Sequence, residues 1–327
     1  LGTAAAVTLF DFRGRAVFEW LLLLPLAMPA YVVAYAYTDF LQFSGPLQLM
    51  LREAFGWRGA LWPDVRSVWG AALVFTVSLY PYVYLLARTA LLERVASLME
   101  AARLLGASLP RRIREVALPL SRPAVAAGVA LALMETLADF GVSSYFGIQT
   151  FTAGIYKAWL AMDNRVAAAQ LATVLLVVVL LLLRLEQRAE RRMRFAQGRV
   201  SRQGTAESQP VRLQGLAQWL AWGMCSLPVL LGFVLPVLIM LRALAGAEVE
   251  LPWARFGDWA WNSLRLGGIT AVLAVGVALL LAFAVRQRAS VWNRTVTQVV
   301  GLGYAIPGAV VVVGLLLPVG WVQQMWP

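Results

Sequence analysis

Histidine is absent from this sequence of 327 residues, and cysteine occurs once, at Cys225. The absence of histidine removes the commonest metal ligand and the commonest general base. A single cysteine inside an apolar run excludes a disulfide framework. The sequence also contains no Gly-x-x-x-x-Gly-Lys-Ser/Thr phosphate-binding loop. We therefore expect a chain that is not an enzyme and binds neither a cofactor nor a resident metal.

Charged residues are scarce too. They make up 14% of the chain, against roughly 25% in a soluble domain. Hydrophobic residues make up 61%, and the mean hydropathy is +0.72. Apolar runs such as 166–183 and 264–285 reach the length of about 20 residues that a helix needs to cross a bilayer. These features predict an all-α polytopic membrane protein rather than a soluble helical core.

Eight membrane segments are predicted, one of them partial. The partial segment covers residues 1–10. The full segments cover residues 18–42, 67–87, 119–141, 166–184, 214–242, 263–285 and 294–318.

The basic residues predict the orientation of these segments. With the first loop in the cytoplasm, the cytoplasmic stretches are 11–17, 88–122, 184–212 and 286–294, which hold 20 of the 28 Lys and Arg residues. This bias follows the positive-inside rule. The net charge of +11 is thus explained by cytoplasmic loops, and no nucleic-acid partner is expected.

The stretch 185–213 is first basic and helix-favouring and then rich in Gly, Ser and Gln, a composition typical of linkers. It favours a cytoplasmic linker between two halves, with a basic helix on anionic lipid as the alternative. An offset of 278 residues places residues 28–33 on residues 306–311, and both stretches carry a proline within an apolar segment. Recurrent proline in membrane helices is the other explanation. The offset supports a parallel repeat of two halves.

The most informative stretch is the predicted cytoplasmic loop 93–119. Its first part has apolar residues at helical spacing on one face. Gly106 is expected to end this helix, and Ser108 to cap a second helix entered through Pro110. The pattern fits either a docking surface for a partner protein or a helix lying on lipid. The apolar stripe consists of Val95, Leu98, Met99, Ala102 and Leu105.

The same loop resembles the EAA loop of ABC importer permeases, in which Glu-Ala-Ala is followed by Gly and then by an aliphatic residue and Leu-Pro at fixed spacing. One departure is a valine where that family usually has isoleucine. The matching residues are Glu100, Ala101, Ala102, Gly106, Val116, Leu118 and Pro119.

This resemblance implies a type I importer (MetI-like) permease fold, as a multi-pass protein of the bacterial inner membrane. It implies that the loop is a coupling helix that docks into a dimer of ATPase subunits, which bind the ATP and Mg²⁺. It also implies a periplasmic solute-binding protein as a partner, besides the lipid bilayer. A secondary transporter or a membrane-bound enzyme has no ATPase to dock, so the loop argues against both.

We expect residues 1–184 to form a first permease half, incomplete at its N-terminus, and residues 214–327 to begin a second half that stops before its own EAA loop. Further stretches are similar to ferric-iron ABC permeases that serve a periplasmic iron-binding protein. Thiamine, sulfate and polyamine permeases share this architecture. The stretches that resemble the iron permeases are 135–141, 145–147, 149–152, 154–159 and 167–172.

Two acidic residues near the outer end of a segment are candidates for the translocation path or for contact with the binding protein. Glu135 and Asp139 have the i, i+4 spacing that puts side chains on one helix face. Hard cations prefer oxygen ligands, which these carboxylates and Tyr145 offer. The alternative is a structural role, as helix caps or as partners of Lys157 or Arg165.

Overall fold

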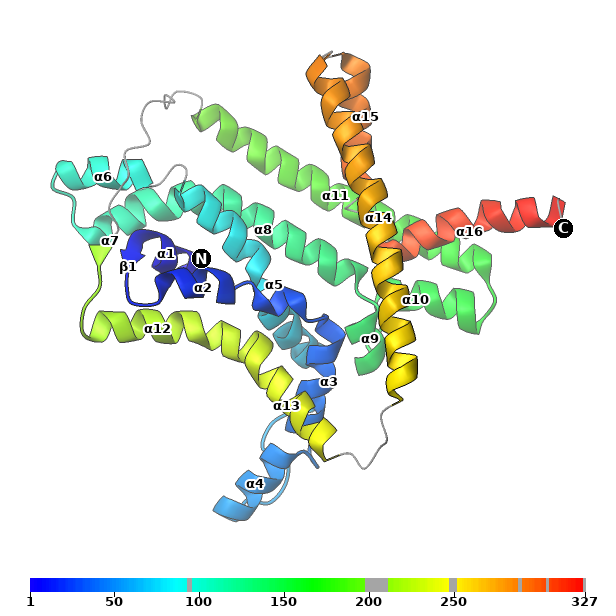
Figure 1. Ribbon diagram of the computed structural model, residues 1–327, viewed down its shortest axis with the longest axis horizontal. Helices are drawn as coiled ribbons and strands as arrows, with labels where there is room; N and C mark the ends of the chain where they lie inside the picture. The colour runs from blue at the N-terminus through cyan, green and yellow to red at the C-terminus, as the bar shows by residue number, and fades with distance from the viewer. Residues whose placement is uncertain (93–95, 198–210, 247–251, 288–289, 304–305, 326–327) are drawn as a thin grey trace. The chain divides into compact units, whose positions relative to one another are not determined.

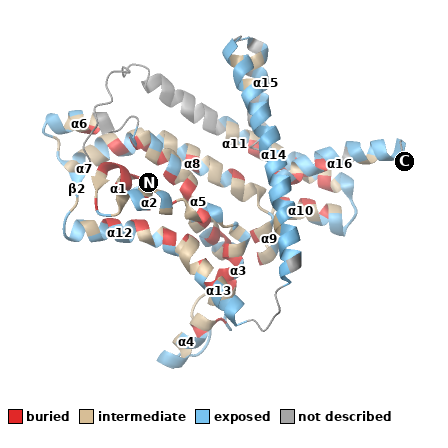
Figure 2. Cartoon of the chain, viewed as in Figure 1, coloured by how far each residue is buried: buried red, intermediate tan, exposed pale blue. Residues whose placement is uncertain are grey.

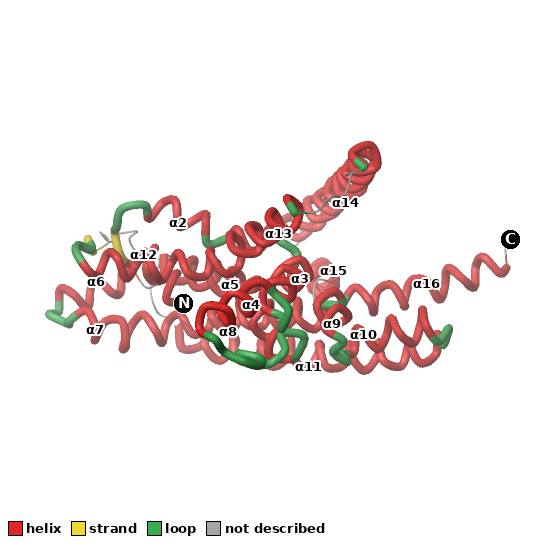
Figure 3. Tube along the Cα trace, turned by 90° about the horizontal axis from the view of Figure 1, so that it is seen from below, coloured by secondary structure: helices red, strands yellow, loops and turns green. Residues whose placement is uncertain are grey.

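The structure is a computed structural model, and it describes residues 1–92, 96–197, 211–246, 252–287, 290–303 and 306–325 (Figure 1). Helices make up most of the described chain, and two strands of two residues each pair with one another (Figure 3). The predicted all-α class is thus confirmed.

The elements up to the first long polar loop are α1 (Gly2–Leu9), β1 (Phe10–Asp11), α2 (Arg15–Leu21), η1 (Leu24–Ala27), α3 (Ala30–Leu41), α4 (Pro46–Phe55), α5 (Val68–Ala90) and α6 (Ala96–Leu104). The remaining elements are α7 (Leu109–Arg112), η3 (Ile113–Ala117), α8 (Leu118–Ala138), α9 (Gly141–Phe146), α10 (Phe151–Tyr156), η4 (Lys157–Ala161), α11 (Arg165–Gln197), β2 (Val211–Arg212), α12 (Leu216–Val229), η5 (Leu230–Val234), α13 (Leu235–Ala245), α14 (Trp253–Gln287), α15 (Val291–Leu302) and α16 (Gly308–Met325).

The chain divides into two compact units. The first contains Leu1–Arg242 together with Pro307–Pro327, and the second contains Ala243–Ile306. In the second unit, α14 and α15 are joined by a bond from the Asn293 side chain to the Ala284 carbonyl, 3.0 Å long. Helix α14 is exposed along its length, as Figure 2 shows.

Among the described residues, six helices are long and apolar enough to cross a membrane, and a sharply bent helix pair raises the number to seven. The predicted segments 67–87 and 166–184 correspond closely to Val68–Ala90 and Arg165–Arg184. The predicted linker begins as a helix, because α11 runs on to Gln197, while residues 198–210 lie outside the described part.

A single helix over the predicted segment 18–42 would be wrong, because that segment is a bent pair of helices. Residues Arg15–Ala27 and Ala30–Phe55 meet at an angle of 86°. Pro25 cannot donate a backbone hydrogen bond, and Pro29 forces the preceding Met28 into an extended conformation, with φ −110° and ψ 123°. The segment is therefore built from α2, the short 3₁₀ helix η1 and α3.

The prediction of one segment over residues 294–318 is also wrong, because α15 ends at Leu302 and α16 begins after Pro307. The two breaks are related by the offset of 278. It carries the start of α3 at Ala30 onto the start of α16 at Gly308. The repeat of two halves stays a prediction.

The core of the first unit is formed by helices that are far apart in the sequence, namely α1, α5 and α12. Ala4 and Val7 of α1 pack in one buried cluster with Tyr84 of α5 and with Cys225 and Val229. Buried residues, red in Figure 2, recur along α1, α5 and α12. The stretch 214–242, assigned from the sequence to a second half, thus packs within the first unit.

The polar loops between the spans lie in two groups, one at each end of the spans of this unit. At one end, Phe10–Asp11 pairs in parallel with Val211–Arg212, and Arg88 pairs with Glu19. At the other end, the Arg66 guanidinium donates to the Tyr145 carbonyl at 2.7 Å. The first end brings together three of the four predicted cytoplasmic stretches, as strict alternation of the spans requires. The charge bias predicts that this end faces the cytoplasm.

Candidate coupling loop and outer polar residues

The first part of the loop 93–119 is helix α6, although residues 93–95, including Val95 of the predicted stripe, lie outside the described part. The Glu100 carboxylate lies 3.7 Å from the Arg103 guanidinium, and these side chains are 35% and 56% exposed. An exposed pair of this kind contributes at most about 1 kcal/mol. Ala101 next to it is exposed, and Ala102 is half-buried.

Gly106 ends the helix as predicted. It has φ +82°, a left-handed conformation that residues with a Cβ rarely adopt. Its N–H donates to the Arg103 carbonyl at 2.9 Å, and the N–H of Ala107 donates to the Ala102 carbonyl at 3.0 Å. This pair of bonds is a Schellman motif. No atom lies within 4 Å of a Cβ built on Gly106, so the backbone conformation and not space requires glycine there.

The second part of the loop holds α6 in place. Met99 is 6% exposed and belongs to the same core cluster as Leu91 and Ala117. The Arg112 side chain donates to the Met99 carbonyl at 3.4 Å. Val116 packs against this cluster, while Leu118 and Pro119 are exposed at the start of α8. The loop is therefore anchored on one side only.

The exposed side of the loop ends in two leucines. Leu104 is 82% exposed and Leu105 is 88% exposed. The prediction that Leu105 shares one apolar face with Met99 is wrong: Met99 is buried and Leu105 is exposed, because α6 ends at Leu104 and the chain turns at Gly106. Ser108 takes the expected N-cap position of α7, but its side chain makes no capping bond. Two large apolar side chains are thus left uncovered beside the glycine turn.

The outer polar residues have separate partners. Glu135 on α8 accepts a hydrogen bond from the Tyr82 hydroxyl of α5 at 3.3 Å. Asp139 follows the end of α8 with ψ 129°, so it does not continue the helical face of Glu135. The carboxylate of Asp139 instead accepts from the Ser143 N–H at 3.1 Å and from its hydroxyl at 3.3 Å.

Asp139 therefore caps the first turn of α9, as the structural alternative proposed, although its partner is Ser143. Burial raises the pKa of the Asp139 carboxyl, and the hydrogen bonds from Ser143, Val142 and Gly141 lower it by less. The cap thus stabilises a carboxylate that burial alone disfavours.

Tyr145 lines a pocket that neither acidic residue reaches. The pocket encloses about 220 Å³, and its walls are almost entirely apolar. The Arg66 guanidinium lies over the Tyr145 ring at 5.3 Å. Among the described residues, no three His, Cys, Asp or Glu side chains form a group that suits a metal ion. The pocket is lined by Tyr31, Val32, Tyr35, Gly141, Tyr145 and Met240.

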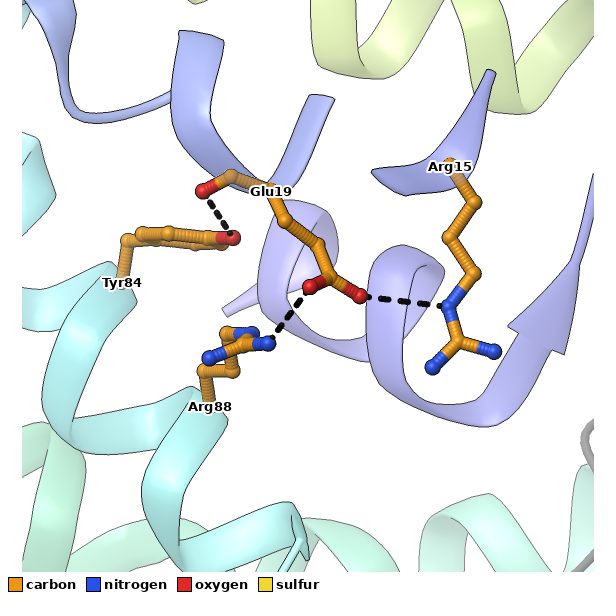
Figure 4. A network of polar contacts seen from close by, with 4 residues as sticks. All are labelled: Arg15, Glu19, Tyr84 and Arg88. Atoms are coloured by element: carbon orange, nitrogen blue, oxygen red, sulfur yellow. Dashed lines mark hydrogen bonds and ion pairs between the residues drawn. The ribbon is translucent and has the colours of Figure 1, made fainter. Parts of the chain in front are cut away.

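A polar network that the sequence analysis missed lies at the end of α5 that leads into the loop (Figure 4). One Glu19 carboxylate oxygen lies 2.7 Å from Arg88, and the other lies 3.3 Å from Arg15. The Tyr84 hydroxyl donates to the Glu19 backbone carbonyl at 3.2 Å. The available signal was an acidic residue inside an apolar stretch, since such residues are costly in membranes and usually paired.

The apolar spans define a multi-pass membrane protein with an exposed, glycine-ended loop. The family described as "Binding-protein-dependent transport system inner membrane component" matches residues 1–195, more than half of the chain. The chain belongs to this family, whose members are inner-membrane permease subunits and not enzymes. The loop 93–119 and the spans up to α11 lie within the matched region.

The similar proteins are named for different transported substances. The "Fe(3+)-transport system permease protein FbpB 2" of Haemophilus influenzae is 27% identical over 326 residues, which are 97% of this chain and 59% of that protein. The "Molybdenum transport system permease protein ModB" of the same organism is 29% identical over 58% of this chain and 85% of its own length. The "Sulfate transport system permease protein CysT" of Salmonella typhimurium is 29% identical over 41% of this chain and 47% of its own length. The chain thus spans less than two thirds of the ferric permease that it matches.

Proposed function

We propose that this chain is the membrane-spanning permease of an ATP-driven importer and that the loop 93–119 docks a separate ATPase. The observation that carries this proposal is the one-sided anchoring of the loop. Met99 and Arg112 fix α6 to the core, while Leu104 and Leu105 project beside the Gly106 turn. Exposed apolar side chains on an anchored helix suit insertion into a groove of a partner protein.

The mechanism follows from this anchoring. When the ATPase subunits bind ATP and Mg²⁺ and close, they displace α6. Because Met99 packs with Leu91, α5 must follow that displacement. The spans then change from an arrangement open to one side of the membrane to an arrangement open to the other side, provided that the ATPase contacts differ between these two states. This chain contributes the docking surface and the path, and its partner contributes the hydrolysis.

We further propose ferric iron, delivered by a periplasmic binding protein, as the cargo. The match to a ferric permease extends over 97% of this chain and thus includes the region beyond residue 195. The motif-like stretches from residue 135 onward support the same cargo. An oxyanion such as molybdate or sulfate is the second candidate, because relatives named for molybdenum and sulfate match shorter parts of the chain.

Glu135, Asp139 and Tyr145 remain candidates for the path or for contact with the binding protein. The cap formed by Asp139 and the bond between Glu135 and Tyr82 favour structural roles for the carboxylates. Tyr145 has the stronger claim, since its ring lines the pocket. Apolar aromatic walls do not suit a tight iron site, and loose contact is what release of a cargo requires.

The two-half organisation is part of the proposal. The linker 185–213 would join a first half to a second half that begins near residue 214. The start of α3 at Ala30 recurs in the start of α16 at Gly308 at the offset of 278. A parallel repeat of this kind places two equivalent half-units around an axis along the membrane normal.

The cargo is tested by uptake into proteoliposomes that contain the permease and its ATPase. Radiolabelled ferric iron, molybdate and sulfate are offered in turn, each with its purified binding protein. We expect ATP-dependent accumulation of iron alone. Accumulation of molybdate or sulfate without iron would replace the cargo and keep the importer, whereas ATP-independent uptake would contradict the importer itself.

A further inference from the structure

Three side chains on one face of α5 donate to the segment before the proline break. Tyr80, Tyr84 and Arg88 are spaced four residues apart and so lie along one side of the helix. The Tyr80 hydroxyl donates to the Leu22 carbonyl at 2.9 Å. Tyr84 and Arg88 donate to the backbone carbonyl and to the carboxylate of Glu19 at 3.2 Å and 2.7 Å. We call these three residues the α5 ladder.

The backbone carbonyls of Glu19 and Leu22 accept these hydrogen bonds. Both carbonyls have lost their usual helical N–H partner because the helix is broken at the prolines. The backbone N–H of Leu23 donates to Trp20 rather than to Glu19, and that of Leu26 donates to Leu23 rather than to Leu22. Pro25 has no N–H to offer. Inside a bilayer a released carbonyl needs a protein partner, because no water replaces the lost bond. The two tyrosine hydroxyls supply these partners.

The ion pair closes the ladder at its cytoplasmic end. Glu19 and Arg88 have side chains only 22% and 30% exposed. The Nε atom of Arg88 is buried without a hydrogen-bond partner among the described residues. Arg88 pairs with the Glu19 carboxylate. Loss of that carboxylate would leave the Arg88 guanidinium as a half-buried cation without its ion-pair partner.

The ladder lies between the docking loop and the pocket. Arg88 stands two residues before the end of α5, and Leu91 just beyond packs in one cluster with Met99 of α6. On the other side of the ladder, α2 and η1 lead through the 86° bend to α3. Tyr31 and Tyr35 of α3 line the pocket.

We infer that Glu19, Tyr80, Tyr84 and Arg88 are positioning residues that make α2 move with α5 and the loop as one body. Displacement of the loop then becomes a change of angle at the break between Ala27 and Ala30, and so a change at the pocket. This inference rests on the proposed docking of the ATPase by the loop.

A ladder that served only to hold the fold would behave differently when it is weakened. Its loss would lower the thermal stability of the permease and leave the motion of the surviving molecules unchanged. A positioning role predicts that molecules with normal stability lose the concerted motion. The deciding measurement is therefore a distance within the folded complex and not an amount of folded protein.

The experiment uses the permease with its ATPase in lipid nanodiscs and distances between paired spin labels. Cys225 is first replaced by Ala so that only introduced cysteines react. One label pair, at Trp20 and Leu92, lies within the proposed body, and a second pair, at Trp20 and Phe43, spans the break. These three side chains are 75%, 45% and 55% exposed, so labels are tolerated there. Distances are compared without nucleotide and after trapping with ATP and vanadate.

In the protein with its native ladder, we expect trapping with ATP and vanadate to change the distance between the labels at Trp20 and Phe43. The distance between the labels at Trp20 and Leu92, the inner pair, should stay the same. Tyr80→Phe with Tyr84→Phe, and separately Arg88→Gln, should broaden the inner distance and reduce the shift across the break by at least half. The control is Asp11→Asn with Arg212→Gln, which removes an exposed ion pair of 3.7 Å at the same end. This control should keep both distances.

Two results overturn the inference while leaving the proposed docking function intact. A trapped shift of the inner pair in the unsubstituted protein shows that α2 and α5 move apart. An unchanged shift across the break in folded ladder variants shows that the ladder does not carry the motion. If the ATPase fails to bind, or trapping shifts neither pair, the proposed docking function fails and the inference fails with it.

Discussion

Arg112 at the end of α7 donates a hydrogen bond to the backbone carbonyl of Met99 on α6, across 3.4 Å. This bond fixes the angle between the two short helices of the loop. Since Met99 itself is buried, the opposite side of α6 is the side left for a partner. The described part of the loop is thus a projection with an exposed tip at Leu104 and Leu105.

The first prediction concerns Gly106→Asp. We expect this change to abolish transport while membrane insertion stays normal, because an acidic side chain then stands at the docking tip. The left-handed backbone adds a strain of about 1 kcal/mol. Transport is measured in vesicles, and insertion by the amount of folded permease in the membrane.

The matched control for this change is Gly56→Asp. Gly56 also has a positive φ, +63°, follows the end of a helix and has no atom within 4 Å of a built Cβ. It therefore carries the same backbone strain on the outer side. Equal loss of transport in both variants would assign the effect to strain and not to docking.

The second prediction concerns the exposed leucines. Leu104→Glu should weaken binding of the ATPase by about ten-fold or more, because a charge replaces an apolar anchor, and the thermal stability should stay unchanged. Met99→Ala should instead destabilise the permease by about 2–5 kcal/mol, since it empties a buried site. Binding is measured by titrating purified ATPase, and stability by thermal unfolding. Unimpaired binding of the Leu104 variant would remove this tip from the interface.

The sequence was sufficient for features that depend on a short window. Mean hydropathy located the spans Val68–Ala90 and Arg165–Arg184, and the turn chemistry of glycine located the end of α6 at Gly106. It was insufficient for the breaks. Pro81 lies inside the unbroken helix α5, whereas Pro25 and Pro29 lie at an 86° bend. The difference depends on distant partners such as Tyr80, which accommodate the released carbonyls of the broken segment.

The polar residues show the same limit. The spacing of Glu135 and Asp139 predicted one shared face, but α8 ends at Ala138 and Asp139 caps the next helix. Helix ends depend on local capping competition that spacing does not reveal. Glu19 and Arg88 are 69 positions apart, so no local pattern joins them.

The third prediction separates the two readings of Asp139. Asp139→Ala removes the cap of α9 and should cost about 0.5–2 kcal/mol of stability. Asp139→Asn keeps an acceptor for Ser143 and removes the charge that burial disfavours, so it should keep both stability and uptake of the cargo. Loss of uptake in a stable Asn variant would instead make the charge itself part of the path.

The fourth prediction concerns the packing of α5 against α8. A Cβ built on Gly128 lies 2.6 Å from the Val83 Cα atom and 3.1 Å from the Tyr82 carbonyl oxygen. Close backbone approach through small residues is how membrane helices associate. Gly128→Ala should therefore destabilise the permease by about 1–3 kcal/mol in thermal unfolding. Gly223→Ala is the control, since a Cβ there meets nothing within 4 Å, and an equal effect of both changes would contradict the packing.

The last prediction concerns the orientation in the membrane. Cysteines introduced at Arg103 and Gln203, with Cys225 replaced by Ala, should react with an impermeant maleimide only from the cytoplasmic side, and a cysteine at Gly56 only from outside. The reason is the location of 20 of the 28 basic residues in the predicted cytoplasmic stretches. The contacts of Glu19 with Arg88 and of Arg66 with Tyr145 place the loops at two opposite ends of alternating spans, so one inverted site implies that all are inverted. Labelling of Arg103 and Gly56 positions from the same side would contradict the alternation, and labelling of the Gln203 position from outside would reverse the orientation and leave the proposed docking loop out of reach of a cytoplasmic ATPase.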